Sequence, residues 1–114
     1  MKIKITYDKI TEILAQHYKK IYADIEFEIK CYRKTTTTPD GYGFFDEHHS
    51  LNATIKVNKK VTVFGKVEEV SEEVVLDELQ IGDILKNALE QDNLVFRYIY
   101  DVKKNSVTVA YDTK

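Results

Sequence analysis

Four consecutive residues near the middle of the chain carry the side chains best suited to metal chemistry. Asp46, Glu47, His48 and His49 supply carboxylates and imidazoles, which are the usual protein ligands of zinc and its neighbours. Adjacent residues of an extended chain point to opposite sides, so at most two of the four can share one ion. The sequence offers no third ligand for either pair. We therefore predict no metal site and no cofactor.

The same part of the chain is rich in glycine and aromatic residues. Residues 35–50 contain the single proline and two of the four glycines, and their hydropathy has no period. We predict a long loop between two strands, and such loops often bind partners. The predicted binding loop consists of Tyr42, Phe44, Phe45, Asp46, His48 and His49. The alternative is a mobile connector whose Phe44 or Phe45 packs at the edge of the core.

Other residues that could be catalytic have simpler interpretations. His17 lies on the apolar stripe of a predicted helix, where a boundary histidine is the ordinary expectation. Cys31 lies on the buried face of a predicted strand, and nothing nearby in sequence lowers its pKa. The sequence has no Gly-x-Ser-x-Gly and no phosphate-binding glycine loop. We predict a protein that is not an enzyme, with an enzyme of unmarked active site as an alternative.

Acidic residues are concentrated in the second half of the chain. Residues 67–92 contain nine acids and one lysine, although the net charge of the whole chain is −2. We predict an acidic helical face that binds a protein partner, because exposed carboxylates can occupy the basic nucleic-acid channel of another protein. This face consists of Glu68, Glu69, Glu72, Glu73, Asp77 and Glu78. The alternative is an ordinary solvated surface.

The sequence argues against direct binding of nucleic acid. The predicted order of helix, three strands and helix is similar to that of double-stranded-RNA-binding domains. The second helix of that family opens with lysines that face phosphate, whereas here acids occupy the matching stretch. Of the seventeen basic residues only Arg33 and Arg97 are arginines, the side chain that binds phosphate in a bidentate manner.

Hydrophobic periodicity predicts the elements that position these residues. Ile10, Leu14 and Ile21 lie on one stripe of a helix that begins after Thr6, and a second helix ends at Asp92-Asn93. Alternation predicts strands over residues 25–31, 51–57, 61–67, 94–100 and 107–111. The polar residues 58–60 predict the turn of one hairpin. Residues 71–77 fit either a strand or a helix.

These elements define the predicted fold as a single α+β domain spanning residues 1–114. We expect a mainly antiparallel sheet of about five strands, with two helices on one face and the order α-β-β-β-α-β-β. The two halves resemble each other weakly, as a pseudo-repeat of two α-β-β units would. The other sheet face would be partly open. Phe64 and several tyrosines on it suggest a homodimer or a surface for another partner.

Composition also indicates where the protein works. The 43% hydrophobic content suffices for one core, and no apolar run approaches a membrane span. A single cysteine cannot form an internal disulfide and suits a reducing compartment. We predict a cytoplasmic location without membrane association.

The residue usage as a whole resembles that of small uncharacterised phage or mobile-element accessory proteins. The resemblance covers roughly the first 35 residues, where a short opening leads into a helix and a strand, and lysine is preferred to arginine. It implies a counter-defence or host-takeover role and carries over no site residues. We predict a non-enzymatic binding module with a protein partner. The alternative is a binder of a nucleotide or signalling molecule that stacks on Tyr42, Phe44 or Phe45.

Overall fold

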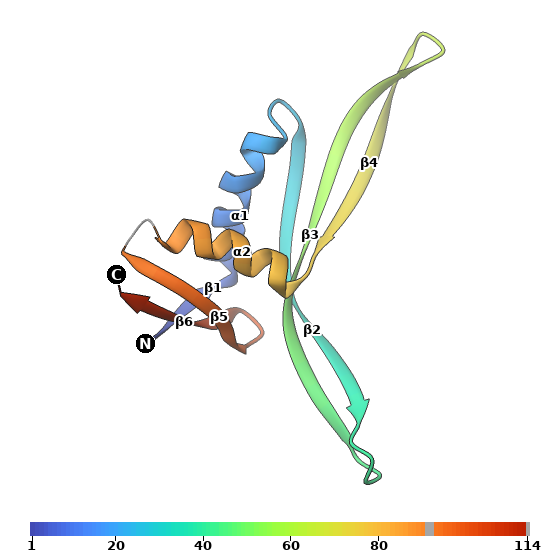
Figure 1. Ribbon diagram of the computed structural model, residues 1–114. Helices are drawn as coiled ribbons and strands as arrows, with labels where there is room; N and C mark the ends of the chain where they lie inside the picture. Colours follow the sequence, from blue (N-terminus) through green and yellow to red (C-terminus); the bar gives the residue numbers. More distant parts are fainter. Residues whose placement is uncertain (91–92, 114) are drawn as a thin grey trace.

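The computed structural model describes residues 1–90 and 93–113. The elements in these residues are β1 (Lys2–Thr6), α1 (Tyr7–Ile21), β2 (Glu26–Pro39), β3 (Phe45–Val63), β4 (Lys66–Leu76), α2 (Glu78–Leu89), β5 (Leu94–Val102) and β6 (Ser106–Thr113). The strands pair antiparallel in two three-stranded sheets, β1-β6-β5 and β2-β3-β4 (Figure 1). The α+β class and the antiparallel pairing are confirmed. The sequence did not predict β1 or the division into two sheets.

Local signals fix the start of each helix. The Thr6 hydroxyl accepts a hydrogen bond from the Lys9 N–H at 3.2 Å, which confirms the predicted N-cap of α1. At α2, Asp77 and Gln80 form a capping box: the Asp77 carboxylate accepts from the Gln80 N–H at 2.9 Å, and the Gln80 side chain accepts from the Asp77 N–H at 3.0 Å. The box places the N-cap of α2 at Asp77, and residues 71–76 before it are strand because they pair with residues 53–58 of β3.

Helix α2 ends earlier than the sequence suggested. Its last residue is Leu89. Of the predicted stop at Asp92-Asn93, Asp92 lies outside the described residues, and Asn93 has a positive φ of 63°.

The long strand β3 organises the second sheet. It has 19 residues, of which residues 45–58 pair with β2 and residues 53–63 pair with β4. Three strands therefore lie side by side only across residues 53–58. Beyond this overlap the sheet continues as two-stranded ribbons that leave the body in opposite directions (Figure 1). We call residues 34–50 arm 1 and residues 59–70 arm 2.

Two sequence predictions about this sheet were wrong. Residues 35–50 form most of a hairpin instead of a loop. The β-branched run Thr35–Thr38 favours an extended backbone, although both faces of the ribbon are exposed to solvent. Residues 58–60 are no turn, since β3 continues to Val63. Their polar character marks the point where the strand leaves the core.

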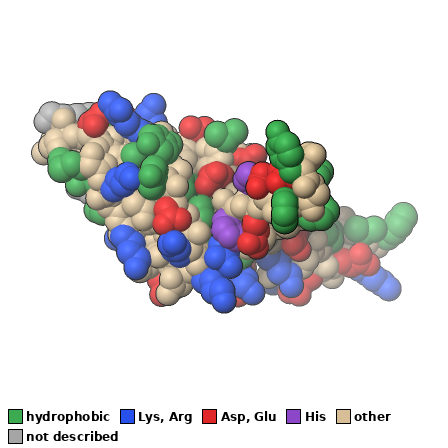
Figure 2. All heavy atoms as spheres, turned by 90° about the horizontal axis from the view of Figure 1, so that it is seen from below, with side chains coloured by type: hydrophobic (Ala, Val, Ile, Leu, Met, Phe, Trp, Pro, Cys, Tyr) green, Lys and Arg blue, Asp and Glu red, His purple; other side chains and the backbone are tan. Residues whose placement is uncertain are grey.

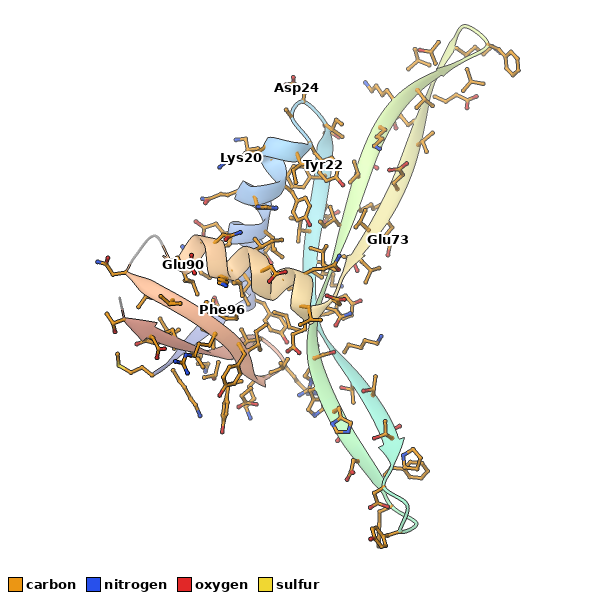
Figure 3. All side chains as sticks on the ribbon, in the orientation of Figure 1. Lys20, Tyr22, Asp24, Glu73, Glu90 and Phe96 are labelled. Atoms are coloured by element: carbon orange, nitrogen blue, oxygen red, sulfur yellow. The ribbon has the colours of Figure 1, made fainter. Side chains whose placement is uncertain are left out.

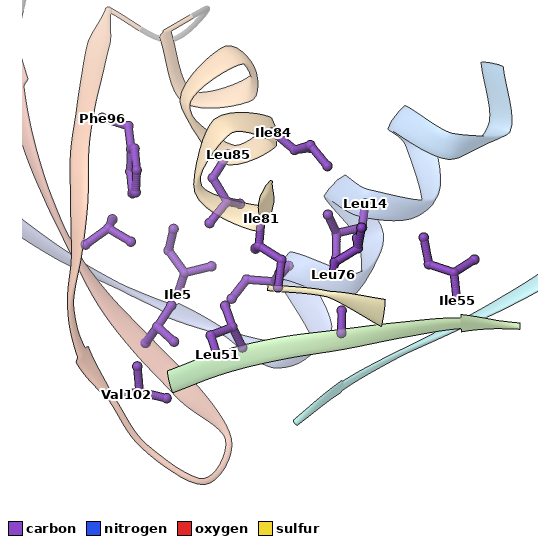
Figure 4. Packing of buried hydrophobic residues seen from close by; sticks show 14 of the residues in the cluster. Ile5, Leu14, Leu51, Ile55, Leu76, Ile81, Ile84, Leu85, Phe96 and Val102 are labelled. Atoms are coloured by element: carbon purple, nitrogen blue, oxygen red, sulfur yellow. The ribbon is translucent and has the colours of Figure 1, made fainter. Parts of the chain in front are cut away.

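The hydrophobic core lies between the two sheets and the two helices (Figure 4). Leu51, Ala53, Ile55 and Val57 alternate along β3, and each is fully buried on the face that the helices cover. Helix α2 also contacts β5, where Phe96 is buried. The opposite face of β2-β3-β4 exposes Lys56 and Glu73, as expected for a partly open sheet.

The arms give the molecule an extended, flat shape. The radius of gyration is 17.5 Å and the principal extents are 59 × 44 × 18 Å, whereas a compact domain of this length has a radius of gyration of about 13 Å. In residues 1–90 and 93–113, neither helix combines the length and apolar composition that crossing a bilayer requires.

Two substitutions on one face of β3 should show that its core part contributes more to the free energy of unfolding than its arm does. Ile55→Ala removes a fully buried side chain and should lower the free energy of unfolding by about 2–5 kcal/mol. Val63→Ala, on arm 2, removes a side chain that is 39% exposed and should cost less than about 1 kcal/mol. Urea denaturation measures both values, and equal losses would contradict the assignment of the arms as ribbons outside the core.

Candidate functional site

Arm 1 is a regular antiparallel ribbon held by backbone pairing and side-chain contacts. Pairing runs without a bulge from Glu26 and Asn58 to Pro39 and Phe45. The Thr35 hydroxyl lies 2.9 Å from Nδ1 of His49. On the other face, the Thr38 hydroxyl lies 3.2 Å from Nε2 of His48. The two histidines thus point to opposite sides, each beside a threonine.

The tip of arm 1 is held in one conformation by Asp40. Its carboxylate accepts hydrogen bonds from the N–H groups of Tyr42 at 2.7 Å and Phe44 at 3.3 Å. Its own N–H donates to the Phe44 carbonyl at 3.1 Å. Gly41 and Gly43 have φ values of 88° and 85°, which glycine adopts without strain. The tip is therefore an ordered turn that presents its side chains in a fixed arrangement.

Three aromatic side chains on this tip are exposed to solvent. Tyr42, Phe44 and Phe45 are 86%, 71% and 72% exposed. The alternative that Phe44 or Phe45 packs at the edge of the core is wrong. Of the predicted binding loop, these three residues and Asp46 lie together at the end of the arm, and His48 and His49 lie further along the ribbon. Figure 2 shows hydrophobic, acidic and histidine side chains gathered at this end.

The tip of arm 2 is a second exposed apolar feature, and it carries Phe64, which the sequence placed on the open face of the sheet. Phe64 and Gly65 form a two-residue turn with φ values of 50° and 79°, typical of a type I′ hairpin. Phe64 is completely exposed. Val61, Val63 and Val70 are exposed on the ribbon beneath it. The glycine of the Phe64-Gly65 dipeptide was the sequence signal for this turn. The signal was weak because phenylalanine rarely adopts a positive φ.

Most of the predicted acidic helical face lies on a strand. Glu68, Glu69, Glu72 and Glu73 lie on β4, Asp77 is the N-cap of α2, and Glu78 is the first residue of that helix. Successive residues of β4 point to opposite faces of the ribbon, so the acids are divided between the two faces. The interpretation as a helix failed because residues 66–76 pair with residues 53–63 of β3.

Lysines of β3 lie directly across from these acids. Lys60 pairs with Glu69 and Lys56 with Glu73 in the strand register. Lys59 forms an ion pair with Glu72 at 2.8 Å between Nζ and Oε2. The acids are thus interleaved with bases, whereas binding to a basic channel needs a contiguous negative surface. The count of charges over residues 67–92 could not reveal these neighbouring lysines, because they lie on a different strand.

A groove of about 650 Å³ lies between the two helices. Ile13, Ile84 and Ala88 supply its apolar part, and His17, Lys19 and Lys20 supply its basic part. His17 is exposed and packs edge-on against Tyr18, with ring centroids 5.0 Å apart. Figure 3 labels Lys20 at the end of α1 that lies away from arm 1.

The sheet β1-β6-β5 carries a smaller aromatic surface. Tyr98 and Tyr100 are about half exposed, and their ring centroids lie 6.1 Å apart. The Lys2 ammonium lies 3.1 Å from the centroid of the Tyr100 ring, a cation–π contact that already covers one face of this ring.

Metal-ligating side chains do not gather into a cluster in the described residues. Within residues 1–90 and 93–113, no three His, Cys, Asp or Glu side chains are placed to hold one ion. The Cys31 sulfur accepts a hydrogen bond from the Thr11 hydroxyl at 3.3 Å. Burial raises the pKa of the Cys31 thiol, while the bond from Thr11 lowers it by less. A raised pKa is the opposite of what a nucleophilic cysteine needs.

Comparisons of the chain with protein-family models, with curated proteins and with solved structures find no match. Its function is therefore inferred from its own residues and their arrangement.

The order of the arm 1 tip should depend on Asp40. Asp40→Ala removes the acceptor of two backbone N–H groups, so the amides of Tyr42 and Phe44 should exchange with solvent about fivefold faster, as loss of one hydrogen bond of ~1 kcal/mol implies. Hydrogen exchange followed by NMR measures this, with the Ile55 amide as an internal reference. Unchanged exchange at Tyr42 would show that Asp40 does not order the tip.

Cys31 should react slowly while the protein is folded. Because its pKa is raised, less thiolate is present at pH 8 than in the unfolded chain, and burial also restricts access. We expect the reaction with a disulfide reagent such as DTNB to be at least about tenfold slower than in urea. The same shift means that the thiol supports folding below its ordinary pKa, and that this support declines as the pH rises above it. Equal rates in the folded and unfolded protein would exclude a buried thiol.

Proposed function

We propose that this protein is a non-enzymatic interaction module that binds a protein partner through arm 1. The observation that supports the proposal is the ordered tip, on which Tyr42, Phe44 and Phe45 are exposed together. Aromatic side chains are enriched in the centres of protein interfaces. A turn that is already ordered loses little conformational entropy when it binds.

The size of the apolar surface agrees with this use. Burying one large apolar side chain contributes about 1.5–3 kcal/mol, so the three tip residues could supply roughly 5–9 kcal/mol. Association costs an estimated 4–15 kcal/mol in lost translational and rotational freedom. The tip alone would thus bind weakly, and useful affinity requires further contacts along the arm or a second contact site.

The alternative of a nucleotide binder and the predicted contact through the acidic face fit the geometry less well. A nucleotide binder needs a concave pocket in which aromatic and basic groups converge, whereas Tyr42 and Phe44 project from the end of a ribbon. A mimic of nucleic acid needs carboxylates that lysines do not neutralise, whereas Lys59 and Glu72 form an ion pair. We therefore place the contact on arm 1, and we retain the expectation of a cytoplasmic accessory protein as part of the proposal.

Crosslinking in the natural host tests the proposal. A photo-crosslinking amino acid at position 42 should give a discrete protein adduct, because this side chain would lie in the interface. The same amino acid in place of Leu79, an exposed apolar residue of α2, is the matched control and should give no such adduct.

A second variant tests the apolar anchors. Phe44→Ser/Phe45→Ser should reduce the adduct at position 42 at least about tenfold, because loss of two buried aromatic side chains exceeds 1.4 kcal/mol. Leu79→Ser should leave it unchanged. Adducts of equal yield from positions 42 and 79, or an adduct that survives the double substitution, would contradict binding through the tip.

A further inference from the structure

The groove between α1 and α2 and the tip of arm 1 have complementary chemistry. The groove combines Ile13, Ile84 and Ala88 with basic side chains at its rim. The tip combines exposed aromatic residues with acids. The open groove, with a volume of about 650 Å³, is large enough to receive aromatic side chains. Apolar surface would meet apolar surface, and opposite charges would meet at the edge.

The charges of both surfaces are free to form new pairs. Within the described part of the chain, Asp46 and Glu47 on arm 1 have no ion-pair partner, and neither do Lys19 and Lys20 at the groove. Complementary charges at the rim of an interface fix its register and accelerate association.

A tip cannot reach the groove of its own molecule. The groove lies between the helices on one side of the body, and arm 1 extends away from the body on the other (Figure 1). The ladder between β2 and β3 is continuous to Pro39 and Phe45, so the arm has no hinge within the ribbon. A tip that fills this groove must come from another molecule.

Resting on the function proposed above, we propose that the partner of arm 1 is a second copy of this chain, whose α1–α2 groove receives the aromatic tip. A twofold rotation that places one tip in the partner's groove also places the partner's tip in the first groove. The contact then forms twice, while the translational and rotational entropy of association is lost once. This doubling supplies the second contact site that a single tip lacks.

Charge reversal at each surface gives the sharpest test. The groove variant is Lys19→Glu/Lys20→Glu, and the tip variant is Asp46→Lys/Glu47→Lys. Each should weaken self-association at least about tenfold, because like charges would meet at both contacts. An equimolar mixture should associate again, since each tip in a mixed dimer meets a groove of opposite charge. Lys103→Glu/Lys104→Glu, a pair of lysines between β5 and β6, is the control with the same charge change and should have no effect.

Sedimentation velocity from low to high micromolar concentration measures these states. A wild-type dimer that each variant dissociates and the mixture restores is the expected result. A dimer that survives the groove variant but not the tip variant would mean that tips pack against each other, and it would overturn the proposal. So would a wild-type protein that stays monomeric throughout.

The two proposals fail separately. A monomeric wild-type protein that still gives a position 42 adduct with a different protein would overturn self-association and leave binding through arm 1 intact. A dimer that persists after Phe44→Ser/Phe45→Ser and after both charge variants would overturn the groove contact, whereas the absence of any protein adduct at position 42 would overturn binding through arm 1.

Discussion

The architecture depends on the staggered pairing of β2 and β4 along β3. Only residues 53–58 of β3 have a strand on both sides, and the alternating apolar residues of this part of β3 meet the helices. A strand of 19 residues is much longer than the five or six that are usual. A short overlap thus anchors two long ribbons, and the core needs to stabilise only the overlap and its immediate surroundings.

The elements that local signals specify could be predicted from the sequence. Thr6 caps α1, the apolar stripe through Ile10 and Leu14 is buried, and the alternation in β2 and β3 identifies the face that meets the helices. The antiparallel connectivity followed from the short connections. Strand β1 could not be predicted in this way, because its five residues pair with β6 at the opposite end of the chain.

The candidate site could be predicted in part. The aromatic residues beside Gly41 and Gly43 marked the correct segment, but a ribbon with two wet faces has no hydrophobic period and resembled a loop. The acidic segment misled for a related reason. The charges counted along one strand do not reveal the charges of the strand that pairs with it. Lys56, Lys59 and Lys60 of β3 lie beside the acids of β4 and offset their negative charge.

The ribbons also leave rows of backbone N–H and C=O groups without a neighbouring strand. Such edges are templates for uncontrolled strand addition, and proteins protect them with charges and with proline. In arm 2, β3 carries Lys59 and Lys60 and β4 carries Glu68 and Glu69, and in arm 1 the edge strand β2 ends at Pro39, which has no N–H to donate. The lysines and glutamates of arm 2 therefore disfavour the addition of further strands at the exposed edges, and so disfavour fibre-like aggregation. They let the molecule keep two long exposed edges while its aromatic tips stay available.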